Sequence, residues 1–233
     1  MAVRSYLPLL VMAAWSGALV WLLLDDNYQL FLKPTFKGLI TASLIICTIL
    51  CISLVKDILS RDQQVKPSLI KGLILLLPIG FIFMAGENTL GEYTLRKRSL
   101  AAPVLQKDDK IIPQTITTTE GKQNISISTL IRQYDQFNGK TVQVEGLFAK
   151  TVVEHDELSA VFRYFITCCA ADAQPVGVFM DSNPDLAIEN NDWVKVSGKV
   201  RKVILDGYEV IFMDVDAIEA AEKPGKNAAY IFN

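Results

Sequence analysis

The chain has 233 residues, of which 51% are hydrophobic and 21% are charged, and its mean hydropathy is +0.29. The 13 Gly, 9 Pro and 4 Cys are ordinary numbers for this length, which excludes collagen-like, low-complexity and disulfide-scaffold classes. The hydropathy is concentrated in three long apolar runs within the first ninety residues. The sequence therefore indicates a membrane-anchored module and not one soluble globular domain.

The charge is distributed unevenly along the chain. Residues 126–233 hold 10 Lys and Arg against 16 Asp and Glu, a net charge of −6. Residues 1–125 hold the other 13 basic and 9 acidic residues, a net charge of +4. An acidic domain repels a phosphate backbone, whose binding depends mainly on Lys and Arg. We therefore expect no nucleic acid as a ligand.

The apolar runs predict a multi-pass membrane region over residues 1–90. Residues 6–24 carry no charge and would extend about 28 Å as a helix, close to the hydrocarbon thickness of a bilayer. This run is too long for a usual signal-peptide core and lacks a small-x-small cleavage pattern, so we expect a retained span. Residues 38–55 predict a second span, and residues 68–90, which contain Pro78, predict a third.

The third run and the orientation leave alternatives open. Only residues 72–86 of the third run are uncharged, and 15 residues also suit a re-entrant segment. Basic residues flanking the spans nearly balance between the two orientations. We favour a cytoplasmic N terminus because four basic residues crowd into the loop of residues 56–71. The C-terminal domain is then expected outside the cytoplasm, at the cell membrane.

No acidic or basic residue lies in the middle of any of the three runs. This pattern speaks against a self-contained transporter, because ion and substrate pathways usually place ionisable side chains at membrane depth. Cys47 and Cys51 are four residues apart and would share one face of the second helix. They would form either a metal or redox pair or, in the simpler interpretation, small residues packed between helices.

A linker and a short helix are predicted after the spans. Residues 91–124 show little apolar periodicity and predict a mostly extended linker. In residues 125–137, apolar side chains recur at spacings of three and four, which predicts an amphipathic helix. Ser126 or Ser128 is its expected N-cap, and Asn138-Gly139 is expected to end it.

From residue 140 onward the apolar period changes to two, which is typical of strands with one buried face. The predicted strands are residues 142–148, 160–167, 175–180, 193–203 and 208–215, with a further short strand near 111–117 and a helical turn at 184–188. Five strands in about 80 residues predict a small β-barrel of the OB type over residues 125–220. A two-sheet sandwich is the alternative, and residues 221–233 are expected to be a C-terminal tail. The fold alone implies no function.

One unusual motif, ITCCAADAQPVG at residues 166–177, stands at the end of the second predicted strand. Neighbouring side chains of a strand point to opposite faces, so Cys168 and Cys169 can serve one site only if the chain turns there. As a metal site, these cysteines with Asp172 and His155 would supply thiolate, carboxylate and imidazole ligands that suit zinc. As a redox site, the cysteines would form a strained disulfide, or one of them would accept a thiol. In the third interpretation, one packs in the core and the other under the turn.

No enzymatic activity is expected. His155, the only histidine, lies between acidic residues in a predicted hairpin turn at residues 155–157, which also suits a solvated acidic loop. The sequence contains no GxSxG, HExxH, P-loop or dinucleotide-binding motif. A single histidine further limits general-base schemes, so no catalytic residue is assigned.

The string RYFITCCAADAQPVG at residues 163–177 resembles the YcgQ-like bacterial proteins, a family of unknown function with a CCxADA motif. The resemblance covers N-terminal spans, a Pro-containing third span followed by Leu90-Gly91, a variable linker and a C-terminal β-domain. The segment after the third span lacks the Pro-Pro of many members. The motif residues that the resemblance marks are Arg163, Cys168, Cys169, Ala171, Asp172, Pro175 and Gly177.

The resemblance implies membership of a two-component membrane permease complex, with a polytopic YraQ-like permease as partner and a link to metal homeostasis. We therefore expect an accessory subunit whose soluble domain captures or gates a substrate, with a metal ion such as zinc as a candidate. One alternative is a membrane-anchored module that uses the vicinal cysteines for thiol, disulfide or metal chemistry without a permease. Another is a purely structural membrane scaffold.

Overall fold

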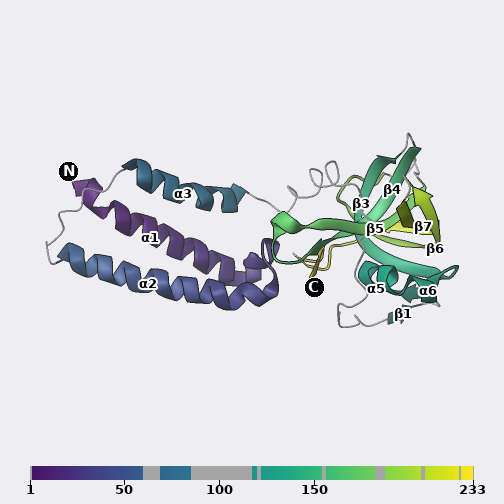
Figure 1. Ribbon diagram of the computed structural model, residues 1–233, viewed down its shortest axis with the longest axis horizontal. Helices are drawn as coiled ribbons and strands as arrows, with labels where there is room; N and C mark the ends of the chain where they lie inside the picture. Colours follow the sequence, from purple (N-terminus) through teal and green to yellow (C-terminus); the bar gives the residue numbers. More distant parts are fainter. Residues whose placement is uncertain are drawn as a thin grey trace. The chain divides into compact units, whose positions relative to one another are not determined.

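The computed structural model describes residues 2–59, 69–84, 117–119, 122–153, 156–181, 187–205, 208–225 and 227–232. The chain divides into two compact units, Met1–Glu87 and Asn88–Asn233. The described part of the first unit is helical, and that of the second is mainly β-structure (Figure 1).

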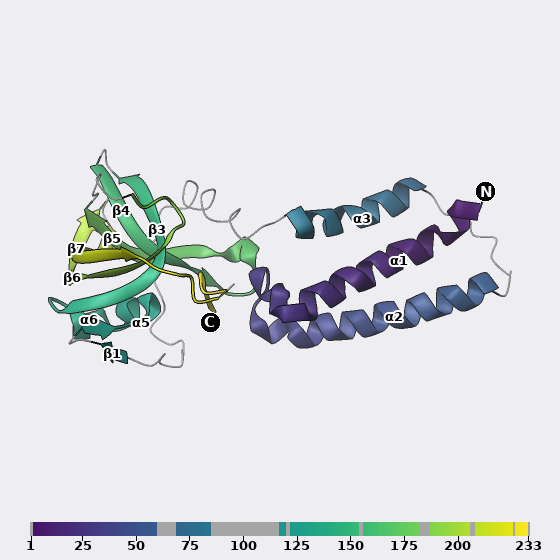
Figure 2. The same cartoon turned by 180° about the vertical axis from the view of Figure 1, so that it is seen from behind.

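Three apolar helices form the described part of the first unit: α1 (Ala2–Leu23), α2 (Lys37–Leu59) and α3 (Leu69–Met84). α1 packs beside both α2 and α3, as the views from front and back show (Figures 1 and 2). The segments Tyr6–Leu30 and Pro34–Lys56 are long and apolar enough to cross a membrane. α3 is shorter, and the ends of the third predicted span, residue 68 and residues 85–90, lie outside the described residues.

The first two helices are joined by a polar turn. The 3₁₀ segment Leu24–Leu30 follows α1, and within it Asp25 and Asp26 have φ values of +50° and +54°. Asp is among the few residue types that adopt this left-handed conformation at moderate cost. The carboxylate of Asp26 accepts a hydrogen bond from Nζ of Lys37 at 2.9 Å, at the start of α2. The turn thus places charged groups at the ends of the apolar helices.

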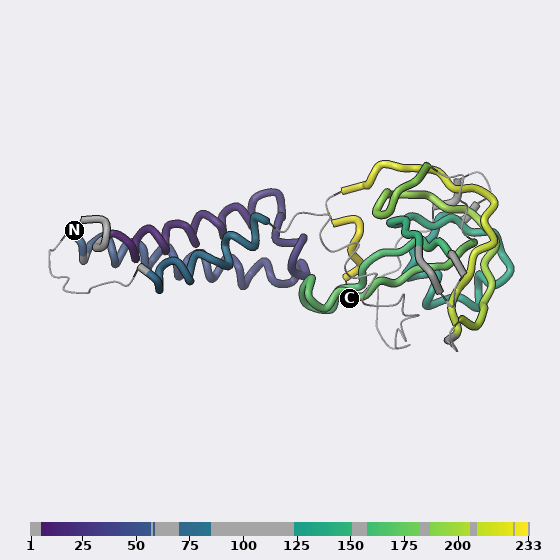
Figure 3. Tube along the Cα trace, turned by 90° about the horizontal axis from the view of Figure 1, so that it is seen from above, coloured from purple at the N-terminus to yellow at the C-terminus, as the bar shows by residue number. Residues whose placement is uncertain are grey.

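A closed five-stranded β-barrel is the main body of the second unit. Its strands are β3 (Thr141–Val153), β4 (Asp156–Ile166), β5 (Gln174–Asp181), β6 (Trp193–Leu205) and β7 (Tyr208–Ala220). The order around the barrel is β3-β4-β5-β7-β6, and β6 pairs with β3 to close it. Only the β5–β7 contact is parallel within this ring. The strands curl around a common interior (Figure 3). The predicted barrel is confirmed, and the sandwich alternative is wrong.

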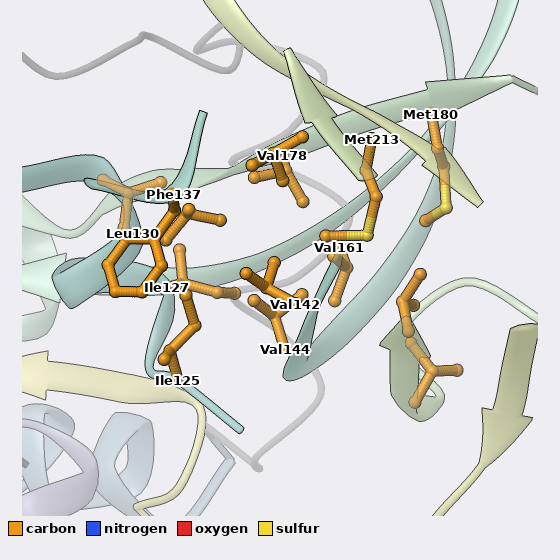
Figure 4. Close-up of a cluster of buried hydrophobic side chains, with 14 of the residues drawn as sticks. Ile125, Ile127, Leu130, Phe137, Val142, Val144, Val161, Val178, Met180 and Met213 are labelled. Carbon is orange, nitrogen blue, oxygen red and sulfur yellow. The ribbon is translucent and has the colours of Figure 1, made fainter. Parts of the chain in front are cut away.

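The core of the barrel is filled mainly by aliphatic side chains, with a few aromatic ones and methionines, and is covered by two short helices, α5 (Ile127–Arg132) and α6 (Tyr134–Phe137). Oγ of Ser126 accepts a hydrogen bond from the backbone N–H of Thr129, which makes it the N-cap of α5. The helices end at a turn in which Gly139 has a φ of +71°. The core side chains that converge in Figure 4 include Ile127, Leu130, Phe137, Val144, Val161, Val178 and Met213.

Three short strands extend the barrel sheet. β1 (Thr117–Thr119) pairs with β2 (Lys122–Asn124), and β2 pairs in parallel with β3. The predicted C-terminal tail contains β8 (Tyr230–Phe232), which pairs in parallel with the end of β4. The sequence did not predict β8, because a three-residue strand is too short to show a period.

Some predicted features lie wholly or partly outside the described residues. These are His155, residues 111–116 of the predicted short strand and residues 184–186 of the predicted helical turn. The hairpin turn predicted at residues 155–157 requires a correction. Asp156 and Glu157 belong to β4, where they pair with Val153 and Val152, because the antiparallel ladder extends further than the apolar alternation.

Candidate functional site

The vicinal cysteines lie in the connection between β4 and β5. Phe165 of β4 faces Gln174 of β5 as the last pair of that ladder, and the chain then leaves the sheet. Buried Ile166 and Ala173 anchor the two ends of the connection in one hydrophobic cluster. Between them, a 3₁₀ turn at Ala170–Asp172 reverses the chain. The turn that both cysteines need to serve one site is therefore present.

The carboxylate of Asp172 organises this connection. Oδ1 accepts the backbone N–H of Thr167 at 3.0 Å, and Oδ2 accepts that of Cys168 at 2.7 Å. Oδ2 also accepts the N–H of Cys169 in a longer contact of 3.4 Å. These three N–H groups lie beyond the last residue of β4, so the carboxylate takes over the role of a neighbouring strand.

Both thiols lie on the same side of the connection. The two Sγ atoms are 3.7 Å apart, and the ligand atoms of Cys168, Cys169 and Asp172 all lie within 4.8 Å of one another. The thiols are free, with Cys168 exposed and Cys169 half-buried. Neither cysteine is in the core, in contrast to the third interpretation from the sequence. Three groups of kinds that bind metal thus converge at an accessible point.

The proton of Cys168 is held by its neighbours. The pKa of Cys168 is raised to about 11, first by its hydrogen bond with the Asp172 carboxylate and then by the one with Cys169. Partial burial raises the pKa of Asp172, but the hydrogen bonds from the Cys168 thiol and the backbone together lower it below its ordinary value. At neutral pH the site therefore holds a protonated thiol beside a carboxylate, and a cation that binds thiolate must displace this proton.

The remaining motif residues support the strands that carry the connection. Nε of Arg163 donates to the backbone oxygen of Glu145 at 2.9 Å, and its guanidinium lies 4.8 Å from the centre of the Trp193 ring. Burial lowers the pKa of Arg163. These contacts fasten β4 to β3 and β6, which gives Arg163 a role in the barrel itself.

Pro175 and Gly177 lie in β5 opposite Tyr164 and Phe162 of β4. A Cβ atom at Gly177 would collide with the backbone oxygen of Val161, so the close approach of the two strands requires glycine. Ala171 is exposed in the 3₁₀ turn. His155, the fourth predicted metal ligand, lies outside the described residues.

Sequence reasoning missed the support that β8 gives to the site. The backbone N–H of Tyr164 donates to the oxygen of Ala229 at 2.7 Å, and Ile166, two residues before Cys168, pairs with Phe232. The buried ring of Tyr164 lies 6.3 Å from that of Tyr230, and burial raises the pKa of Tyr164. The apolar run Tyr230-Ile231-Phe232 after a polar segment was the available signal.

In the comparison with solved structures, three chains match, and two of them are described below; both are similar at a low level. One is described as an aspartyl-tRNA synthetase from Leishmania major Friedlin, with 16% identity, a TM-score of 0.29 and coverage of 47% of this chain and 23% of the synthetase. This chain thus spans less than a quarter of that protein. The other is a small single-stranded DNA-binding protein from Streptomyces coelicolor, with 17% identity, a TM-score of 0.22 and coverage of 38% and 99%.

The comparison with curated proteins gave no match. The comparison with protein families matched residues 98–233, more than half of the chain, to the DUF1980 C-terminal domain. This match contains the whole barrel, the connection with Cys168 and Cys169, and β8. The chain therefore belongs to the family of the DUF1980 C-terminal domain.

Proposed function

We propose that this protein is the accessory subunit of a two-component membrane permease complex. Its spans anchor it beside a polytopic YraQ-like permease, and its barrel, of the OB type, captures or gates the substrate. The DUF1980 domain fits a YcgQ-like family, which supports the proposal. The observation that carries it is a folded barrel with an accessible cluster of two thiols and a carboxylate, joined to apolar helices in one chain.

The apolar helices support a role as anchor. In the described residues of α1, α2 and α3, charged side chains occur only near the helix ends. Oγ of Ser16 in α1 lies 3.8 Å from Sγ of Cys51 in α2, which favours the packing interpretation of Cys51 over a metal or redox pair. A substrate pathway through the bilayer therefore requires a second membrane protein.

The proposed topology has three spans, with the barrel outside the cytoplasm. The third span needs residues beyond α3, which alone has 16 residues. Reporter fusions after residue 62 and at the C terminus test this topology. We expect a cytoplasmic reporter in the first case and an extracytoplasmic one in the second. A cytoplasmic reporter at the C terminus would contradict the proposed orientation.

Affinity purification of the tagged, full-length protein from its native membranes in mild detergent tests the proposed complex. Mass spectrometry of co-purifying proteins should identify a polytopic permease in stoichiometric amount. If the helices make the contact, the Cys168→Ser/Cys169→Ser variant, which is altered only in the barrel, should retain the partner. The Cys47→Ser variant, a conservative change within α2, should retain it as well. Purification of the protein alone would contradict the permease proposal.

A second candidate function is a thiol or metal module that acts without a permease. The convergence of two free thiols at an accessible position favours it. In that case the protein purifies alone, and Cys168→Ser/Cys169→Ser abolishes its cellular function while the barrel stays folded. Full cellular function of that variant would exclude this candidate.

A further inference from the structure

We infer that Cys168 and Cys169 form a two-thiolate binding site for a thiophilic divalent metal ion of the zinc type, held in shape by Asp172. This inference rests on the proposed function, because it names the class of substrate that the barrel would capture. In this inference Asp172 is a positioning residue, whereas the sequence had suggested that it binds the metal directly, as the two cysteines do.

The distance between the sulfurs suits one metal ion bound by both. Two Zn–S bonds of about 2.3 Å at a tetrahedral angle place their sulfurs about 3.8 Å apart. The Sγ atoms of Cys168 and Cys169 are already 3.7 Å apart. A tetrahedral ion could therefore bind both thiolates with little movement of the chain. An ion that takes two ligands in a line would need the sulfurs about 4.6 Å apart at the same bond length.

The backbone disfavours the competing disulfide. The Cα atoms of adjacent residues are about 3.8 Å apart, whereas disulfides usually join Cα atoms about 4.4–6.8 Å apart. A disulfide between Cys168 and Cys169 would therefore store strain and be reduced easily. A metal ion bound by both cysteines avoids this strain. It joins the sulfurs through two sulfur–metal bonds, so the sulfurs do not have to come within bonding distance of each other.

Asp172 is already occupied by the backbone. Its two oxygens accept three backbone N–H groups, those of Thr167, Cys168 and Cys169. A carboxylate offers about four acceptor positions, so few remain for a metal ion. The bonds to the N–H groups of Cys168 and Cys169 hold both residues in the turn that brings their side chains together. Asp172 therefore acts on the metal through the position of the sulfurs.

The exposure of the site fits an ion in transit. Structural zinc sites are closed by four protein ligands, whereas a site with fewer protein ligands keeps open positions. Cys168 is exposed, and in the described part of the chain the group around it comprises Cys169 and Asp172 alone. With these two thiolates as its ligands from the described residues, a tetrahedral ion keeps two positions for ligands from a donor or from the permease. Exchange of ligands at these positions would allow the ion to be passed on.

Titration of the reduced, metal-free, full-length protein with Cd²⁺ alone tests the site. Cd²⁺ is a zinc-like ion that gives an ultraviolet charge-transfer band when bound by thiolate. The protein is kept in mild detergent and carries an affinity tag without histidine. We expect one equivalent of Cd²⁺ per chain, a sulfur-to-metal band, and displacement of the bound Cd²⁺ by Zn²⁺. X-ray absorption of the zinc-loaded protein should count two sulfur ligands.

Variants separate the ligands from the positioning residue. Cys168→Ser and Cys169→Ser should each weaken binding at least tenfold, while the matched control Cys47→Ser/Cys51→Ser keeps the band unchanged. Asp172→Asn keeps one acceptor oxygen, which can accept the N–H groups of Cys168 and Cys169 in place of Oδ2, and should retain part of the binding that Asp172→Ala loses. Equal losses in the Asn and Ala variants would overturn the positioning role. A band that persists in Cys168→Ser/Cys169→Ser, or no binding by the folded wild type, would overturn the site.

Failure of the metal site and failure of the proposed permease complex give different results in these experiments. Metal binding without a co-purifying permease would remove the proposed function and leave the site intact. A co-purifying permease with no metal binding would overturn the inference about the site alone.

Discussion

Asp172 connects the backbone of the β4–β5 connection with the chemistry of its thiols. Its carboxylate lies beside the Cys168 thiol, and both pKa values shift as expected for such a pair. For Asp172 the lowered pKa means that its stabilising effect is present above the ordinary value of 3.8 and is lost as the pH falls through the folded-state pKa. For Cys168 the effect is present below 9.0 and is lost as the pH rises towards about 11. The connection is therefore most stable between these limits.

Substitution of Asp172 should make Cys168 more reactive at neutral pH. In Asp172→Asn the negative charge that holds the thiol proton is gone, so the pKa of Cys168 should fall from about 11. Alkylation by iodoacetamide, followed for each cysteine by mass spectrometry between pH 7 and pH 11, measures this change. The control Asp135→Asn, exposed on α6, should leave the profile unchanged. Identical profiles for Asp172→Asn and wild type would contradict the assigned pair.

Gly177 should be required for stability of the barrel. In Gly177→Ala the new methyl group meets the backbone of Val161 and Phe162, which cannot move without disturbing the β4–β5 ladder. Overpacking of this kind costs about 1–3 kcal/mol. Thermal unfolding of the detergent-purified protein, followed by the circular dichroism of its β-structure, should show a lower midpoint. Gly38→Ala in α2, where nothing lies within 4 Å of the added atom, is the control, and equal midpoints would contradict the prediction.

At the scale of elements, β8 links the C-terminal segment to the cysteine site. It continues the sheet along β4 at Tyr164, Phe165 and Ile166, directly before the connection begins. The aromatic side chains of Tyr230 and Phe232 pack on the hydrophobic cluster that contains Ile166 and Ala173. Ala173 lies at the far end of the connection, next to β5. The C-terminal strand therefore supports both ends of the loop that carries the thiols.

Removal of β8 should loosen the connection without unfolding the barrel. In a chain that ends at Gly225, the N–H of Tyr164 loses its partner Ala229, and each lost hydrogen bond removes about 0.5–1.5 kcal/mol. Amide hydrogen exchange should accelerate at Tyr164 and at Cys168, while the β6–β7 ladder stays protected. A chain that lacks only Asn233 serves as the control. Unchanged exchange at Cys168 after removal of β8 would contradict the supporting role.

At the scale of the whole molecule, apolar surface and charge are divided between two units. The apolar helices expose large side chains such as Leu73, Ile49 and Phe81, which in a membrane would face lipid. Residues 126–233, which hold the barrel, instead carry a net charge of −6. An acidic surface attracts cations, which agrees with the proposal that the barrel captures a metal ion.

This division predicts how the protein partitions. The full-length chain should sediment with membranes and resist extraction with alkaline carbonate, because the apolar helices are held by the bilayer. A chain that begins at residue 98 should stay in the soluble fraction with the β-structure of the barrel. Release of the full-length chain by carbonate would contradict a membrane-spanning anchor. Sedimentation of the shortened chain would show that the barrel itself binds membranes.

The sequence alone determined the elements whose residues interact with near neighbours. The apolar runs and the alternation of the five barrel strands are local patterns, so they predicted apolar N-terminal helices and the barrel. They also predicted a helix before the barrel, which is two short helices, α5 and α6, and Ser126 was one of the two expected N-caps. Only the tertiary structure decided that the Asp172 carboxylate accepts the N–H groups of Thr167 and Cys168. It alone also decided that the backbone of β4 lies too close to Gly177 for a side chain, and that β8 supports the site. The contacts of Gly177 and β8 join segments that meet only when the sheet forms, and an apolar period along the chain does not show them. The Asp172 contacts span only four and five residues, but they depend on how the chain turns after β4, which an apolar period does not show either.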